Sequence, residues 1–415
     1  MFRRSIGRVC MVMLMLVFVS SVAALAEEVT ITFFHCCGQD YRNALYSELS
    51  RAFEARYPGV KVEDIFPAAG GGGYSDNIKV AIAGGRPPDV MWLGNGLWNF
   101  ADVLLPLNSL YENEPHIKEI LPHIIKSHIW EGKLIGMPYG INTHAFYYNE
   151  NMLAEAGIVM PNDWTWDEAI SMAKKMTKDN NADGTMDQWG LALSELTQCY
   201  TFGDSFYTPD LRKTTINNPG TIAGVQMYAD LVTDKYGVHP PSGIGGSNLL
   251  MYQGKVAMAP RGVFELADYE KNAEFDWNVQ IYPELQVGGQ TYRTSWFSSE
   301  TWAVYAGTKN PDMALKFVSF LMERENMIKF SNLGGIVPTQ PSVARASFLQ
   351  ATKPANIKAF TDMLDWWKSG YSHPAGVTLP GEHSQIMTGQ IPASTGIQEI
   401  ERKVNDLLDA FWSKR

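Results

Sequence analysis

In this 415-residue sequence, the side chains that could catalyse a reaction or bind a ligand are mainly acidic and aromatic. A pair of carboxylates could hydrolyse a glycosidic bond, and the sequence offers 44 Asp and Glu residues from which such a pair could come. Its 12 tryptophans could instead hold a sugar, because the C–H faces of a sugar lie against aromatic rings while its hydroxyls need polar partners. Trp92, Trp98, Trp296 and Trp302 fall at predicted strand ends or in loops. Two classes of function are therefore open, a carbohydrate-binding protein and a secreted carbohydrate-active enzyme with paired carboxylates.

Recognised catalytic motifs do not favour the enzyme. The sequence has no Gly-x-Ser-x-Gly elbow, no Walker loop and no His-Glu-x-x-His motif. Four glycines at 70–73 precede a predicted helix and could cradle a phosphate, but a flexible loop is the simpler interpretation.

A second candidate is the segment Asp179-Asn-Asn-Ala-Asp183-Gly184, which has the oxygen spacing of the start of a calcium loop. Gly190 stands where that loop needs a bidentate Glu. We therefore prefer an Asx-rich turn for residues 179–187, with calcium binding as the alternative.

The cysteines leave their pairing open. Cys36 and Cys37 are adjacent and could form a strained vicinal disulfide, either could pair with Cys199, or all three could be buried thiols. Metal capture by His35 with these cysteines lacks the usual ligand spacing. We expect neither a metal nor a cofactor.

The first 26 residues predict a secretory signal peptide. They carry three arginines within the first eight residues, continue with an apolar run over residues 9–25 that only Ser20 and Ser21 interrupt, and end with Ala24-Leu25-Ala26. A single membrane anchor is the alternative, but the small residues lie where a signal peptidase cuts. The mature chain would begin near Glu27 and be exported, to the periplasm or outside the cell.

Length and charge narrow the class of protein further. A chain this long exceeds the roughly 250–300 residues at which one core stops growing, so we expect two lobes. The aromatic content of 12% and charged content of 19% exclude a disordered chain. The sequence has 34 basic residues, and three of them are removed with the signal peptide. The mature chain then has 31 basic and 44 acidic residues, a formal net charge of −13. Such an acidic surface argues against nucleic acid and anionic membranes as partners.

The first third of the mature chain alternates strands and helices. Alternating or continuous apolar patterns predict the strands, and apolar residues at helical spacing predict the helices. The predicted order is strand 29–34, helix 44–53, strand 60–64, helix 76–83 and strand 90–93. This alternation is typical of an α/β lobe with a mainly parallel sheet. Ligands of such sheets gather beyond the carboxyl ends of the strands, here at residues 35–40 and 94–98.

Later segments continue the same pattern. A capping box from Thr165 to Glu168 predicts a helix through about residue 176. Further helices are expected at 221–233, 314–321 and 399–411, with a buried strand at 256–258. We assign Trp164, Trp166 and Trp277 to structural roles because they lie at helix starts or in predicted strands.

In their order, these segments resemble the extracellular solute-binding proteins of sugar ABC transporters, family 1, the group that includes the maltose-binding protein. The similarity covers essentially the whole mature chain. Its most specific stretches are Ala83-Gly-Gly-Arg-Pro-Pro-Asp-Val-Met91 and Trp130-Glu-Gly-Lys-Leu-Ile-Gly-Met-Pro-Tyr139. The other stretches that carry it are residues 31–34, 53–62, 147–149, 165–168, 254–258, 310–317 and 334–338.

This resemblance implies a two-lobe periplasmic-binding-protein fold, each lobe a mainly parallel sheet flanked by helices and joined to the other by hinge strands. The implied N-terminal lobe is 27–140 plus 298–338, and the implied C-terminal lobe is 141–297 plus 339–415. The implied function is to bind a sugar between the lobes, without covalent chemistry, and to deliver it to a membrane permease as a monomer.

The resemblance also implies the ligand-binding residues. They lie in loops after strands or at the chain crossings between lobes, namely His35, Gln39, Asp40, Trp92, Asn95, Asn142, Thr143, Arg261, Gly262, Phe264 and Trp296.

Two departures from the family pattern keep the type of sugar open. The first loop reads His35-Cys-Cys-Gly38 in place of the common version with Trp or Asn. Arg261, with Arg293 nearby in sequence, could indicate an anionic ligand such as a uronate or a sugar phosphate. The alternative for Arg261 is an interlobe salt bridge.

Overall fold

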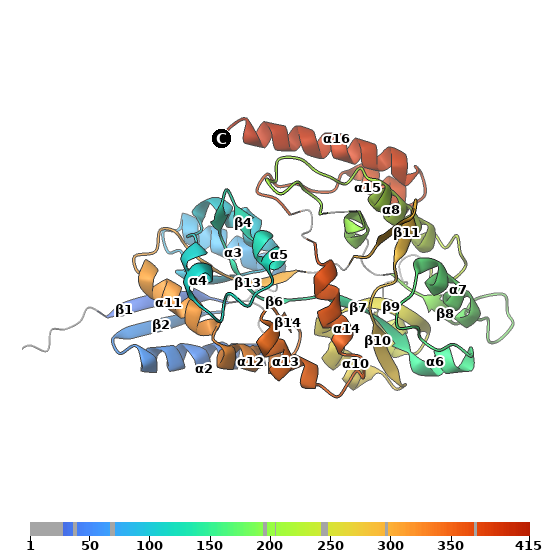
Figure 1. The fold of residues 1–415 in the computed structure, drawn as a ribbon, viewed down its shortest axis with the longest axis horizontal. Helices are drawn as coiled ribbons and strands as arrows, with labels where there is room; N and C mark the ends of the chain where they lie inside the picture. The colour runs from blue at the N-terminus through green and yellow to red at the C-terminus, as the bar shows by residue number, and fades with distance from the viewer. Residues whose placement is uncertain are drawn as a thin grey trace, which may run out of the picture.

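The computed structural model describes residues 28–35, 40–66, 71–193, 197–203, 205–241, 248–294, 298–368 and 372–415. The predicted signal peptide, Cys36, Cys37, Gln39 and Trp296 lie outside these ranges. Within them the chain forms two mixed β-sheets with helices packed around each (Figure 1). These are the two lobes of the expected α/β architecture.

The elements follow one another in a mixed order along the chain. The strands are β1 (Val29–Phe34), β2 (Val60–Ile65), β3 (Val90–Leu93), β4 (Ile129–Trp130), β5 (Lys133–Leu134), β6 (Met137–Ile141), β7 (His144–Asn149), β8 (Trp189–Leu191), β9 (Val256–Gly262), β10 (Trp277–Gln280), β11 (Leu285–Val287), β12 (Gln290–Tyr292), β13 (Ser299–Val304) and β14 (Val337–Pro338). The α-helices are α2 (Asp40–Arg56), α3 (Gly71–Ala83), α4 (Asn108–Asn113), α5 (Pro122–Lys126), α6 (Glu150–Glu155), α7 (Trp166–Met176), α8 (Pro219–Val232), α9 (Asn248–Tyr252), α10 (Leu266–Asn272), α11 (Pro311–Leu321), α12 (Arg324–Asn332), α13 (Pro341–Ala346), α14 (Lys358–Asp362), α15 (Gly381–Met387) and α16 (Ala393–Trp412). The 3₁₀ helices are η1 (Asn95–Val103), η2 (Thr197–Thr201), η3 (Val263–Glu265), η4 (Phe348–Gln350) and η5 (Met363–Trp366).

The larger sheet has the strand order β14-β6-β13-β3-β1-β2. β1 runs parallel to β2 and β3, whereas β13 is antiparallel to β3 and β6, and β14 is antiparallel to β6. β1, β2, β3 and β6 therefore run in one direction and only β13 and β14 oppose them, so most strands of this sheet are parallel in direction, as expected. β6 leads out of this sheet toward β7 and β13 returns to it, so these two neighbours run in opposite directions, while α2 and α3 supply the crossovers that parallel strands need.

The smaller sheet has the order β10-β7-β9-β8 and is also mixed. β8 pairs with β9 in parallel, and β7 pairs with β9 and β10 antiparallel. Only Asn142 and Thr143 separate β6 of the larger sheet from β7 of the smaller one. The chain thus passes between the sheets within two residues, at the middle of the molecule (Figure 1).

Helices cover both faces of the larger sheet. In β1, Ile31 and Phe33 pack into the cluster that contains Phe53 of α2 and Phe317 of α11. Phe34, the next residue, packs into a different cluster together with residues of α3. This alternation is the period of 2 that predicted the strand, and it produces a helix–sheet–helix sandwich.

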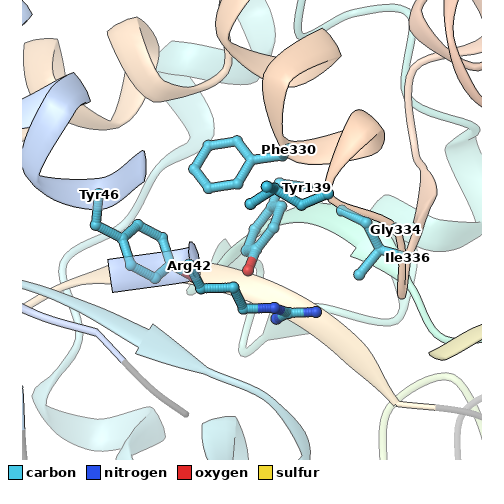
Figure 2. A pocket seen from close by; sticks show the side chains of 7 residues that line it. Arg42, Tyr46, Tyr139, Phe330, Gly334 and Ile336 are labelled. Atoms are coloured by element: carbon cyan, nitrogen blue, oxygen red, sulfur yellow. The ribbon is translucent and has the colours of Figure 1, made fainter. Parts of the chain in front are cut away.

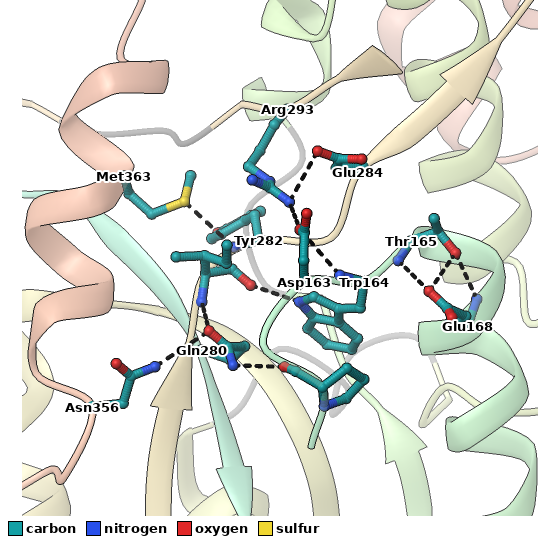
Figure 3. Close-up of polar contacts among 12 residues, drawn as sticks. Asp163, Trp164, Thr165, Glu168, Gln280, Tyr282, Glu284, Arg293, Asn356 and Met363 are labelled. Atoms are coloured by element: carbon teal, nitrogen blue, oxygen red, sulfur yellow. Dashed lines mark hydrogen bonds and ion pairs between the residues drawn. The ribbon is translucent and has the colours of Figure 1, made fainter. Parts of the chain in front are cut away.

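Most of the expected elements are confirmed. The capping box is present, with the Thr165 hydroxyl accepting from the Glu168 backbone N–H at 3.2 Å and the Glu168 carboxylate accepting from the Thr165 N–H at 2.7 Å (Figure 3). Trp164 and Trp166 are buried, as the structural assignment predicts. The last helix is longer than expected, since α16 begins at Ala393.

Gly190 allows α7 to lie directly on β8, and this close approach makes a testable prediction. A Cβ at Gly190 would lie 2.0 Å from the Ala173 carbonyl oxygen of α7. This oxygen belongs to the helix backbone, so it cannot move away by a side-chain rotation. We expect Gly190→Ala to cost at least about 1–3 kcal/mol in the free energy of unfolding, measured by denaturant titration. Gly381→Ala is the matched control, since a Cβ there meets nothing within 4 Å. Equal stabilities of the two variants would contradict this packing.

Candidate functional site

A buried carboxylate organises the edge of the larger sheet where the chain crosses to the smaller one. Glu300 of β13 accepts hydrogen bonds from the indole N–H of Trp92, from the hydroxyl of Tyr139 at 3.3 Å and from the amide of Asn142 at 2.8 Å. The same Asn142 amide donates to the Ser298 hydroxyl at 2.8 Å. Trp92 and Asn142 lie at or beyond the carboxyl ends of β3 and β6, and Glu300 meets them because antiparallel β13 begins where those strands end.

Helix α2 places a second set of side chains beside Glu300. Arg42 and Tyr46, one helical turn apart, line a pocket of about 10 Å³ together with Tyr139 and the end of α12 (Figure 2). Burial raises the pKa of Tyr46 to about 12 and that of Tyr139 well above its ordinary value. Both hydroxyls therefore keep their protons at neutral pH and remain hydrogen-bond donors.

The smaller sheet contributes the turn that follows β9. Arg261 is 1% exposed, and its Nε lies 3.7 Å from a carboxylate oxygen of Glu265. His144, at the start of β7, pairs with Gly262 in the sheet, and its ring centroid lies 6.0 Å from that of Phe264. Burial, together with the positive charge of Arg261, lowers the pKa of His144 to about 3, so this imidazole is neutral at physiological pH.

The two sets of residues meet at Gly335. A Cβ at this position would lie 2.8 Å from a terminal guanidinium nitrogen of Arg42 and 3.7 Å from Cβ of Phe264. The backbone φ of Gly335 is +83°, a conformation that favours glycine. Arg42 of α2 and the half-exposed ring of Phe264, from the turn after β9, therefore lie on either side of one short backbone segment.

His35 belongs to the same region. It follows β1, is 1% exposed, and its ring centroid lies 4.2 Å from those of Tyr46 and Phe66. Burial lowers the pKa of His35 to about 3. Neither ring nitrogen has a hydrogen-bond partner among the residues that the structure describes.

The structure thus brings together, of the implied ligand-binding residues, His35, Trp92 and Asn142 on one side and Arg261, Gly262 and Phe264 on the other. Thr143 is buried, and its hydroxyl donates to the carbonyl of Phe360 in α14 at 3.1 Å. Gln39 and Trp296 fall outside the described ranges. Asp40 begins α2 and Asn95 begins η1, but their side chains are not part of the described structure.

Other residues singled out in the sequence lie elsewhere. Arg293 is 5% exposed and forms ion pairs with Asp163 and, at 3.3 Å, with Glu284 (Figure 3). Trp302 is fully buried and stacks on Tyr139 with ring centroids 4.4 Å apart, so its assignment to a strand end or loop is wrong and its ring belongs to the core. Arg261 forms an ion pair with Glu265, which comes from the same turn.

Sequence reasoning missed Glu300, Tyr139, Arg42 and Tyr46. Glu300 is an acidic residue directly before the apolar stretch 301–304, and a charge at the edge of a buried strand is a usable signal. Arg42 and Tyr46 have the i, i+4 spacing that places two side chains on one helix face, immediately after the loop that was expected to bind ligand.

Residues 179–187 form a tight turn. The carboxylate of Asp179 accepts from the backbone N–H groups of Asp183 at 3.2 Å and Gly184 at 2.8 Å, and that of Asp187 accepts from Asn180 at 2.9 Å. These bonds are those of the Asx-rich turn that the sequence favoured. Among the described residues, no group of three or more His, Cys, Asp or Glu side chains is arranged to hold a metal ion.

The chain is similar in fold to solved structures of solute-binding proteins. The cyclic alpha-maltosyl-1,6-maltose binding protein of Arthrobacter globiformis matches with a TM-score of 0.78 at 16% identity, covering 92% of this chain and 99% of that one. An ABC substrate-binding protein of Listeria monocytogenes, solved in complex with cycloalternan, matches with a TM-score of 0.74 at 23% identity, with the same coverage. The chain therefore has the fold of this class.

The family follows from the sequence as well. Residues 48–378 match the model for bacterial extracellular solute-binding proteins, and the chain belongs to that family. A binding protein of Brucella abortus is 23% identical over 329 residues, 77% of this chain and 78% of the relative. The galactooligosaccharide-binding protein of Bacillus subtilis is 26% identical over 305 residues, 69% of this chain and 67% of the relative. Within the described ranges, no helix has both the length and the apolar character needed to cross a bilayer.

Buried neutral histidines make the stability of the fold depend on pH. Burial lowers the pKa of His35 and His144 to about 3 and that of His128 and His373 to about 4. Below pH 6.5 the unfolded chain takes up protons that the folded chain does not. Their contribution is therefore complete above pH 6.5, and it decreases as the pH falls toward 4, by up to about 1.4 kcal/mol per histidine per pH unit.

Replacing one histidine isolates this effect. We expect His128→Asn to lose less stability than the unmodified chain between pH 6.5 and pH 4.5, in denaturant titrations at each pH. His116→Asn is the control, because His116 is partly exposed and also contacts a backbone carbonyl. Identical pH slopes for the unmodified chain and His128→Asn would show that His128 is not held neutral.

Proposed function

We propose that this chain is the substrate-binding component of an ABC importer. It captures a sugar, either a monosaccharide, an oligosaccharide or a derivative, between its two lobes and presents it to the membrane permease. Its predicted signal peptide places this capture in the periplasm or outside the cell. The lobes of the proposal are 27–140 with 298–338 and 141–297 with 339–415. The placement of β6 and β13 in the larger sheet and of β7 in the smaller one supports a division near these limits.

One observation carries the proposal. Arg42, which lines one pocket with Tyr139 of the Glu300 cluster, and the half-exposed ring of Phe264 from the other lobe lie on either side of Gly335. A sugar needs this combination, since its hydroxyls require directed partners and its C–H faces pack on rings. Sugar ligands named for the relatives, such as galactooligosaccharide and maltotriose, support the same class.

We further propose that the chain binds its sugar without catalysing a reaction on it. The Glu300 carboxylate already accepts three hydrogen bonds from protein groups, and Glu265 is ion-paired with Arg261. Both carboxylates therefore serve as fixed partners rather than as a free acid and base. The formal charge of −13 for the mature chain supports a soluble monomer that binds no nucleic acid.

The proposed ligand contacts come from both lobes. His35, Trp92 and Asn142 act on one side, and Arg261, Gly262 and Phe264 on the other. Gln39, Asp40, Asn95, Thr143 and Trp296 complete the proposed set.

Thermal unfolding of the mature chain against neutral sugars, polyols, uronates and sugar phosphates tests this function. A sugar present at about 100 times its dissociation constant should stabilise the fold by roughly 2.7 kcal/mol, seen as a raised midpoint. We expect one class of sugar to raise the midpoint and to be recovered intact. A flat panel would contradict sugar binding, and recovery of a cleaved product would favour the carbohydrate-active enzyme.

Phe264 provides a variant that separates binding from folding. Because its ring is 46% exposed, Phe264→Ala should change stability little but weaken binding of the stabilising sugar about tenfold, roughly 1.4 kcal/mol, in isothermal titration. Met186→Ala is the matched control, since Met186 is 44% exposed and lies in the turn at 179–187. Unchanged affinity in Phe264→Ala would remove this ring from the site.

A further inference from the structure

A surface groove lies beside the turn that follows α12. Its walls are α10 and Trp277 of β10 on one side, and the end of α12 with residues 347–357 on the other. The groove has a volume of about 460 Å³, within the roughly 300–1,000 Å³ of ordinary ligand pockets. In Figure 1, α12, α13 and α10 follow one another along the lower edge of the molecule, where this groove lies.

The inner surface of the groove is aromatic and apolar. Trp277 is half-buried, and its ring stacks on Tyr147 with centroids 5.6 Å apart and an interplanar angle of 17°. Phe348 is buried, and Leu266 and Leu333 are half-buried. These side chains pack on the core around the larger sheet, which holds them in place. The groove thus offers a fixed apolar surface, of the kind that the C–H faces of a sugar pack on.

Exposed polar side chains surround this apolar surface. Glu270, Asn332 and Lys353 line the groove and are exposed. In the part of the chain that the structure describes, none of the three side chains takes part in a hydrogen bond or an ion pair. They are therefore available as directed partners for hydroxyl groups. One carboxylate and one ammonium are the charged groups of the lining, so the groove has no net charge and suits a neutral ligand.

The groove and the proposed sugar site share a wall. Leu333 and Gly334 line both the groove and the pocket of Figure 2. A Cβ at Gly334 would meet nothing within 4 Å, so the space beside this residue is open. A Cβ at the next residue, Gly335, would lie 3.7 Å from Cβ of Phe264, and α10 begins two residues after Phe264. Two glycines without side chains therefore form a low wall between the groove and the site.

We propose that this groove binds further units of an oligosaccharide whose first units lie between the lobes. The inference rests on the proposed function and adds that the ligand is a neutral oligosaccharide. The sugar chain passes over Gly334 and Gly335, with a C–H face on Trp277 and hydroxyls bonded to Glu270 and Lys353. Because both sets of contacts act on one molecule, the groove adds affinity without the full entropic cost of a separate binding event.

Isothermal titration of the mature chain with sugars of increasing length tests the groove. The probes are glucose, maltose and maltotetraose in one series, and galactose, β-galactobiose and β-galactotetraose in the other. We expect the tetrasaccharide of one series to bind at least about tenfold more tightly than its disaccharide, with a single molecule bound per chain.

Variants of the polar rim assign the added affinity to the groove. Glu270→Ala and Lys353→Ala should each weaken binding of that tetrasaccharide about three- to tenfold, and leave the affinity for the disaccharide unchanged. Glu274→Ala and Lys271→Ala are the charge-matched controls, since both side chains are exposed near the end of α10 and do not line the groove. The controls should bind both sugars as the unmodified chain does.

Equal affinities for the disaccharide and the tetrasaccharide would overturn the groove and keep the proposed function. A monosaccharide that raises the melting midpoint while neither series of oligosaccharides binds would do the same. Tetrasaccharide binding that Glu270→Ala and Lys353→Ala leave unchanged would also overturn the groove. Two molecules of one sugar bound per chain would show a separate surface site and overturn the continuous path. A flat panel for every sugar would contradict the groove and the proposed function together.

Discussion

Three hydrogen bonds to one buried carboxylate determine how the central part of this molecule is arranged. Glu300 is 6% exposed, and a buried charge is costly unless donors surround it. Its donors Trp92, Tyr139 and Asn142 come from β3, from β6 and from the segment that leads to β7. Satisfying this carboxylate therefore fixes the edge of the larger sheet, the start of the crossing segment and the orientation of a tryptophan at the same time. The proposed ligand site is built on that arrangement.

The architecture follows from sequence pattern to a large extent. Alternating residues in 29–34 predict a strand, and β1 does span Val29–Phe34, with Ile31 and Phe33 in one cluster and Phe34 in another. Local chemistry also predicts the start of α7 at Thr165. Strand direction is not contained in such local patterns. The sequence predicts mainly parallel sheets, but the antiparallel placement of β13 depends on the chain returning from the smaller sheet, which is a long-range property.

The candidate site is less predictable, because its residues meet only in three dimensions. Resemblance to a family pointed to His35, Trp92, Asn142 and Arg261, which the structure places close to the crossing segments. It gave no indication of Glu300, whose hydrogen-bond partners lie 158 to 208 residues away in sequence. Trp302 is the reverse case, a residue offered as a sugar-binding candidate that belongs to the core. Tryptophan is common in both environments, and only the stacking on Tyr139 assigns this one to the core.

A crystal structure of the mature chain with the sugar that most raises its melting midpoint tests the central claim most directly. We predict that the sugar lies between the lobes, with hydroxyls hydrogen-bonded to groups of the Glu300 cluster and one face of a ring against Phe264. Density for the sugar on the outside of either lobe, without contacts to both the Glu300 cluster and the Arg261–Phe264 turn, would contradict it.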